Sequence, residues 1–183
     1  RGTKGATFRN LEFSWMENGV GKNSSSSVNI KNFAAFSAKD GTTKDENNQS
    51  VSTRIEAVNI TVGRTISDEC RNGAELFKTG SSITGFAGMI FEAEGTSIIN
   101  SGFSGLVSAT IASSTAPQVY VGGLIGSGET DLSNPGENTM SLVNCYIGAV
   151  QQTKFEFNLN SAKQSSIGVV AGKLTNSAVT GVI

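Results

Sequence analysis

Short runs of apolar and β-branched residues, separated by Gly, Asn and Ser, recur along the whole chain. Ile, Val, Phe and Thr fill the runs, as is typical of strands, and the residues between them are typical of turns. Helical spacing is nearly missing, and its best candidate, 67–78, is weakened by Gly73. The pattern predicts an all-β chain with little helix and with strands at 7–13, 27–36, 51–62, 83–91, 97–111, 118–125, 140–151, 155–159, 166–171 and 178–183.

Three stretches in the second half of the chain repeat one pattern. Each begins with a Gly-bounded apolar run, at Gly85, Gly122 or Gly168, and continues to an Asn that precedes a small residue. One such repeat cannot bury its own apolar face, whereas stacked copies share a continuous core. We therefore expect a right-handed β-solenoid, or β-helix, with irregular loops. It forms a single domain over 1–183, as part of a longer protein, with degenerate repeats over 1–80.

The Asn residues of the repeats are predicted to occupy tight corners between strands. Asn tolerates the left-handed backbone conformation and bonds to neighbouring backbone groups. Asn100, Asn144 and Asn176 are therefore expected to stack as a ladder.

About half of the apolar residues at matching repeat positions should face the core, because neighbouring residues on a strand point to opposite faces. These residues are Ile98, Ile99, Leu124, Ile125, Leu142, Val143, Val169 and Val170.

The second repeat reads GGLIG at 122–126 and SLVNCYIGAV at 141–150. It resembles the GLUG repeat, whose pattern is GG-apolar-apolar-G, then apolar-x-NCY and G-x-V. The third repeat, GVVAG at 168–172 with NSAVTGVI at 176–183, is similar but lacks the Cys-Tyr pair. The resemblance covers 85–183. It implies a repeat region of secreted or surface proteins of bacteria and protists, some adhesin-like and some attached to IgA-cleaving metalloproteases.

Composition excludes several functions. Charged residues make up 16% of the 183 residues and the net charge is -1, so a basic surface for nucleic acid is absent. The chain has no His, which removes His-based catalysis and His metal sites. No apolar run is long enough to span a membrane as a helix. We expect no cofactor, no nucleic-acid partner and no membrane insertion.

A few residues are candidates for covalent modification. Cys70 and Cys145 either form a disulfide or remain free and buried. Asn23, Asn48 and Asn59 begin N-x-S/T sequons, which matter if the protein is secreted from a eukaryotic cell. Asn23 and Asn48 lie in the predicted polar loops 19–27 and 38–50.

Candidate catalytic or ligand-binding residues each have a simpler structural explanation. Asp40, Asp45 and Glu46 offer carboxylates for glycoside chemistry, but they lie in a polar segment that reads as a hydrated loop. The glycines of 122–128 fit no phosphate-binding motif and read as turn residues. Sugar-stacking aromatics are a further option, at Trp15, Tyr120 and Tyr146.

The leading functional hypothesis is a non-catalytic, extracellular or cell-surface protein with a structural or adhesive role, such as a filament subunit. The alternatives are a β-helical polysaccharide lyase or hydrolase, which needs converging carboxylates, and a carbohydrate-binding module, which needs an exposed aromatic platform. The apolar segment 178–183 would be an aggregation hazard if left open. We therefore expect self-association or coverage by further repeats, with a glycan or a host-surface molecule as the candidate ligand.

Overall fold

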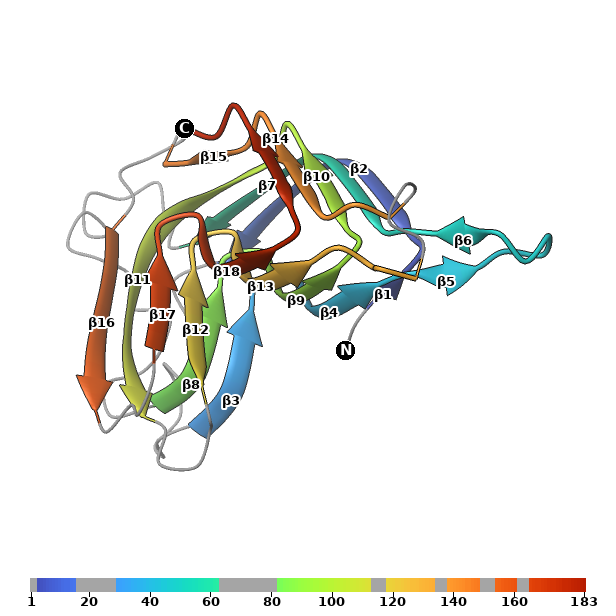
Figure 1. Ribbon diagram of the computed structural model, residues 1–183. Coiled ribbons are helices and arrows are strands. Elements are labelled where there is room, and N and C mark those ends of the chain that lie inside the picture. The colour runs from blue at the N-terminus through green and yellow to red at the C-terminus, as the bar shows by residue number, and fades with distance from the viewer. Residues whose placement is uncertain are drawn as a thin grey trace.

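The computed structural model describes residues 3–15, 29–62, 82–112, 118–133, 138–148, 154–160 and 165–183. All regular structure in these ranges is β-strand (Figure 1). The helical candidate 67–78 lies outside the described residues. The strands are β1 (Thr3–Lys4), β2 (Thr7–Trp15), β3 (Asn29–Ala34), β4 (Ser37–Gly41), β5 (Thr43–Lys44), β6 (Ser50–Val51), β7 (Arg54–Val62), β8 (Ser82–Ala87), β9 (Ile90–Glu94), β10 (Ser97–Ile99), β11 (Gly102–Ala112), β12 (Val119–Gly122), β13 (Ile125–Glu129), β14 (Ser141–Val143), β15 (Tyr146–Ile147), β16 (Lys154–Asn160), β17 (Ser165–Gly168), β18 (Ala171–Thr175) and β19 (Ala178–Thr180).

The strands form two parallel sheets and one hairpin. The small sheet has five strands in the order β1-β4-β9-β13-β18. The large sheet has twelve strands along the path β17-β12-β8-β11-β7-β10-β14-β19, with β2, β3, β15 and β16 branching from it. The antiparallel hairpin β5-β6 lies in a segment that we predicted to be a loop.

The expected right-handed β-solenoid is wrong, although the strands and the parallel pairing between repeats are present. The strands are distributed over several sheets, and part of the large sheet curves into a half-barrel (Figure 1). The cause lies in the long strand β11, which pairs with β7, β8, β15 and β16 along its eleven residues. One strand therefore joins two parts of the large sheet, and a uniform coil does not result.

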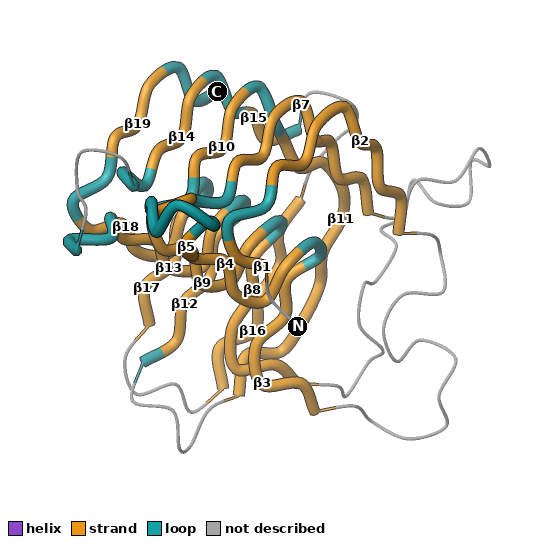
Figure 2. Tube along the Cα trace, turned by 90° about the vertical axis from the view of Figure 1, so that its right-hand side faces the viewer, coloured by secondary structure: helices purple, strands orange, loops and turns teal. Residues whose placement is uncertain are grey.

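Strands of successive repeats pair in register, so equivalent side chains form rows across the sheets. Figure 2 shows β2, β7, β10, β14 and β19 side by side in that order. One row of this sheet is apolar and faces inward, and Ile55, Ile98 and Leu142 within it are fully buried. From one edge to the other, the row is Phe8, Ile55, Ile98, Leu142 and Val179.

Aromatic rings fill the remaining core beneath the half-barrel. Phe86 is fully buried, stacks on Phe33 at a centroid distance of 5.9 Å and meets Phe103 edge-on at 6.3 Å. Half of the eight residues that we expected at matching core positions are fully buried, which agrees with the predicted proportion. They are Ile98, Leu124, Ile125 and Leu142.

A line of left-handed residues runs across the large sheet at one corner. Asn100 and Asn144 occupy neighbouring positions in this line, with φ of 49° and 50°. By register, the full line is Asn10, Ala57, Asn100, Asn144 and Gly181, and all five have a positive φ. The structure places Asn176 elsewhere, at the corner of the small sheet in register with Gly95. Our alignment of the third repeat was therefore shifted, because Gly181 takes the place of the Asn at the large-sheet corner, whereas Asn176 occupies the other corner.

The small residue after each Asn also has a structural role. The hydroxyl groups of Ser101 and Ser177 donate to the carbonyl groups two residues earlier, at 2.7 and 2.9 Å. The thiol of Cys145 lies 3.6 Å from the equivalent carbonyl oxygen, that of Val143. Each small side chain satisfies a backbone acceptor where the strand breaks, so the Asn-small pair marks a corner.

Replacing Asn144 tests the conformational role of the corner. Asn144→Ala should lower the free energy of unfolding by about 1 kcal/mol, because alanine is disfavoured at positive φ. Asn144→Gly is the matched control and should stay much closer to the parent protein. Urea denaturation followed by circular dichroism measures both. Equal stability of the alanine and glycine variants would contradict the proposed role of the backbone conformation.

Candidate binding groove

A groove of about 230 Å³ lies on the outer face of the small sheet. Alternate strand residues build it, because neighbours on a strand point to opposite faces. Ala93 on β9 is buried, whereas its neighbours Glu92 and Glu94 project outward, and β13 repeats this pattern around Gly128. The groove is lined by Lys39, Asp40, Glu92, Ala93, Glu94, Tyr120, Ser127, Gly128, Glu129, Lys173 and Thr175.

The register of the small sheet arranges the charged groups in two rows. The first row consists of Lys39, Glu92, Ser127 and Lys173 on four neighbouring strands. Lys39 Nζ lies 3.3 Å from Glu92 Oε2, and both side chains are about half exposed. Such an exposed ion pair contributes little stability, so both charges remain accessible to a ligand.

The second row places two carboxylates side by side. Glu94 and Glu129 are register partners on β9 and β13, with Thr175 next in the row. Neighbouring strands lie ~4.8 Å apart, and like charges directly opposite each other destabilise a sheet. The groove therefore presents closely spaced hydrogen-bond acceptors, with Lys39 and Lys173 as donors in the first row.

Tyr120 adds an aromatic ring from the large sheet. It lies on β12, and its hydroxyl group donates to Gln118 Oε1 at 2.7 Å. Gln118 Nε2 donates in turn to Ser166 Oγ on β17 at 3.2 Å. This chain of bonds holds the half-buried ring beside the charged rows, and it makes Tyr120 the candidate sugar-stacking aromatic that lies in the groove.

Asp40 differs from the predicted hydrated loop residue because it is fully buried on β4. One carboxylate oxygen accepts a hydrogen bond from the Thr3 hydroxyl group, and Oδ2 has no partner among the described residues. Burial raises the pKa of Asp40 above its ordinary value of 3.8, although the Thr3 bond opposes that shift. Asp45 lies apart in the β5-β6 turn, where it accepts amide hydrogens from Asn47 and Gln49 at 2.9 and 2.8 Å.

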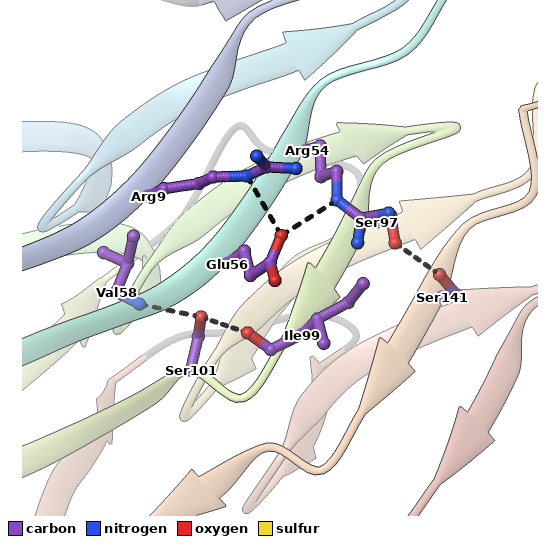
Figure 3. A network of polar contacts seen from close by, with 8 residues as sticks. All are labelled: Arg9, Arg54, Glu56, Val58, Ser97, Ile99, Ser101 and Ser141. Atoms are coloured by element: carbon purple, nitrogen blue, oxygen red, sulfur yellow. Dashed lines mark hydrogen bonds and ion pairs between the residues drawn. The ribbon is translucent and has the colours of Figure 1, made fainter.

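The outer surface of the large sheet carries a second polar cluster (Figure 3). Glu56 Oε2 lies 3.1 Å from Arg9 Nε and 3.2 Å from Arg54 Nε, which links β2 to β7. Ser141 Oγ donates to Ser97 Oγ at 3.0 Å across β14 and β10. The Arg9–Glu56 and Ser97–Ser141 contacts each join two neighbouring strands across this surface.

The remaining modification candidates occupy different environments. Cys145 is a free, buried thiol whose pKa is raised by burial, and Cys70 lies outside the described residues. Asn48 is exposed in the β5-β6 turn. Asn59 lies within β7, where its side-chain oxygen accepts a hydrogen bond from the Tyr146 hydroxyl group. Asn23 and Trp15 have no described side-chain environment.

Sequence reasoning did not single out Glu92, Glu94, Glu129, Lys39 or Lys173. The available signal was a polar-x-polar triplet soon after the Gly-bounded run: EAE at 92–94, SGE at 127–129 and KLT at 173–175.

The described residues contain no group of three or more His, Cys, Asp or Glu side chains that could hold a metal ion. Over the same ranges no helix is long and apolar enough to cross a membrane.

Comparison with known proteins finds no matching family model, no matching curated protein and no matching solved structure. The groove and the fold must therefore be interpreted from their own chemistry.

The buried carboxylate gives a prediction about pH. Because the folded pKa of Asp40 exceeds the unfolded value, ionisation penalises the folded state above the folded pKa, and the penalty disappears as pH falls toward 3.8. Asp40→Asn should therefore raise the unfolding free energy at pH 7, and this advantage should shrink on acidification. Urea denaturation at pH 4 to 7 measures it.

Asp131 serves as a comparison, because its pKa is shifted in the opposite direction to that of Asp40. Hydrogen bonds from Ser133 and Thr42 lower its pKa below 3.8. The ionised carboxylate therefore stabilises the folded state above pH 3.8, and this stabilisation is lost as the pH falls below that value. Asp131→Asn should therefore destabilise the protein at pH 7. Identical pH profiles for the Asp40→Asn variant and the parent would contradict the assignment for Asp40.

The sequons give a second prediction. After secretion from a eukaryotic cell, Asn48 should carry a glycan, because it lies in an exposed turn. Asn59 should remain unmodified, because it packs within a strand and Thr61 of its sequon is buried. Intact mass before and after deglycosylation measures occupancy, with Asn48→Gln and Asn59→Gln as matched variants. If deglycosylation still lowers the mass of Asn48→Gln but no longer lowers the mass of Asn59→Gln, the glycan is on Asn59 and the prediction is wrong.

Proposed function

We propose that this is a non-catalytic extracellular or cell-surface protein with an adhesive role, and that the groove on the small sheet binds a hydroxyl-rich glycan. The observation that carries the proposal is the position of Tyr120 beside two rows of outward polar side chains. The apolar face of a sugar ring packs on an aromatic ring, and its hydroxyl groups bond to carboxylates and ammonium groups.

The balance of charges in the groove favours such a ligand over an ionic one. Four acidic residues, one of them the buried Asp40, and two lysines line it, so both acceptors and donors are available. A strongly anionic chain would meet Glu94 and Glu129, and a cationic one would meet Lys39 and Lys173. A neutral polyhydroxylated chain can use both sets of groups.

The setting of the groove favours binding over turnover. Its charged residues project from regular strands of the small parallel sheet, which hold them in fixed positions, and Tyr120 projects from β12 of the large sheet. The chain supplies no His as a proton-transfer group. The exposed sequon at Asn48 and the resemblance to surface-protein repeats support an extracellular location.

Glycan binding can be tested with an oligosaccharide array followed by calorimetry on the strongest hit. Tyr120→Ala should weaken binding at least about tenfold, in line with the loss of an aromatic stacking contact of about 1.5 kcal/mol. Glu129→Gln should weaken it less, because the amide still accepts a hydrogen bond. Tyr146→Phe is the matched control outside the groove and should bind like the parent.

Two results would contradict the proposal: a parent protein that binds no oligosaccharide on the array, or a Tyr120→Ala variant that binds as well as the parent. Release of a shortened sugar product during the assay would instead favour the polysaccharide-active alternative.

A further inference from the structure

The outward polar positions of the small sheet extend further across its strands than along them. Each of β4, β9, β13 and β18 supplies one side chain to the first row, which consists of Lys39, Glu92, Ser127 and Lys173. With neighbouring strands ~4.8 Å apart, this row is roughly 14 Å long. The groove therefore offers four evenly spaced hydrogen-bonding positions in the direction across the strands.

Along a single strand the groove offers fewer positions. On β9, Glu92 and Glu94 project outward, whereas the other three residues of the strand are buried. The strand is followed directly by the left-handed corner residue Gly95, whose φ is 62°. Two outward side chains on one strand are only roughly 7 Å apart. A long ligand therefore meets more polar side chains when it lies across the strands.

Tyr120 lies toward the β18 end of the first row. It precedes Val121 on β12, and Gly172 on β18 packs so closely on this strand that a Cβ atom there would lie 2.9 Å from the Val121 nitrogen. Lys173, the residue after Gly172, lines the groove together with Tyr120. Lys39 is at the other end, on β4, three strand positions from β18. A sugar ring stacked on Tyr120 is therefore near Lys173 and far from Lys39.

The strand spacing matches the step of one kind of sugar chain. When six-membered rings are joined through equatorial bonds, the chain is extended, and each ring advances it by nearly one strand spacing. An axial bond instead bends the chain into a coil, so successive rings leave a flat surface. An extended chain laid across the strands can therefore present hydroxyl groups to each polar side chain of the first row in turn.

We propose that the glycan is an extended, linear chain of equatorially linked six-membered sugar rings, and that it lies across the strands of the small sheet with about one ring per strand. One ring stacks on Tyr120, and the following rings reach Ser127, Glu92 and Lys39 in turn. This assignment rests on the glycan-binding function proposed above, and it adds the class of glycan and the direction in which it lies.

Calorimetry with oligosaccharides of defined linkage tests the class of glycan. The extended probes are cellotetraose, chitotetraose and β-linked mannotetraose, and maltotetraose is a coiled probe with the same glucose units as cellotetraose. At least one extended tetrasaccharide should bind, and it should bind at least about tenfold more tightly than its own disaccharide, because the added rings reach charged side chains on β9 and β4. Maltotetraose should bind at least about tenfold more weakly than that tetrasaccharide.

Variants of two lysines test the direction. Lys39→Met removes the donor at the far end of the row, so it should weaken the tetrasaccharide about tenfold and leave the disaccharide unchanged. Lys173→Met removes the donor near Tyr120 and should weaken both lengths. Lys44→Met is the matched control, because Lys44 is exposed in β5 outside the groove, and it should bind both like the parent. Circular dichroism checks that each variant keeps the fold.

Equal affinity for the two lengths, or maltotetraose binding as tightly as every extended tetrasaccharide, would overturn the proposed class of glycan. A Lys39→Met variant that binds the tetrasaccharide like the parent, or that loses both lengths equally, would overturn the direction. Binding of another oligosaccharide but of none of the three extended probes would overturn this assignment and leave the glycan-binding function intact. A parent that binds no oligosaccharide would overturn both together.

Discussion

Parallel pairing in register between successive repeats is the interaction on which the other features depend. Once Ile98 pairs with Leu142 and Ile55, the apolar residues of three strands meet in one buried row. A shift by one residue would turn each of these side chains to the opposite face. The same register places Glu92, Ser127 and Lys173 in a row on the outer face, so the core and the groove have a common origin.

The corners stabilise this register. A left-handed residue bends the chain at the same point of each repeat, and Asn or Gly adopts that conformation at low cost. Ala57 is the exception in the line, with φ of 53°, and it carries strain of about 1 kcal/mol for an L-residue with a Cβ. Pairing with Asn10 and Asn100 on both sides holds it there.

Local sequence signals predicted strands, corners and part of the core, because they depend on backbone preference and alternation. Asn100 and Asn144 could be paired from the sequence, since each precedes a small residue that bonds back to the strand. The curvature of the large sheet could not be predicted from the sequence, because it depends on which strands β11 pairs with along its length. The groove was missed for a similar reason: Glu94 and Glu129 are 35 positions apart and become neighbours only through register. Asp40 was misjudged because a polar segment was taken to be hydrated throughout, whereas β4 turns this carboxylate inward.

The direction of the backbone hydrogen bonds has a mechanical consequence. In both sheets these bonds run from strand to strand, across the rows. Tension applied between the strands β1, β2 and β3 and the strands β17, β18 and β19 would load one strand pair at a time and peel the sheets open from an end at low force. Tension applied along the strands would load many bonds together in shear and meet much higher resistance. A protein built in this way resists a load that pulls along its strands and yields to one that pulls its repeats apart.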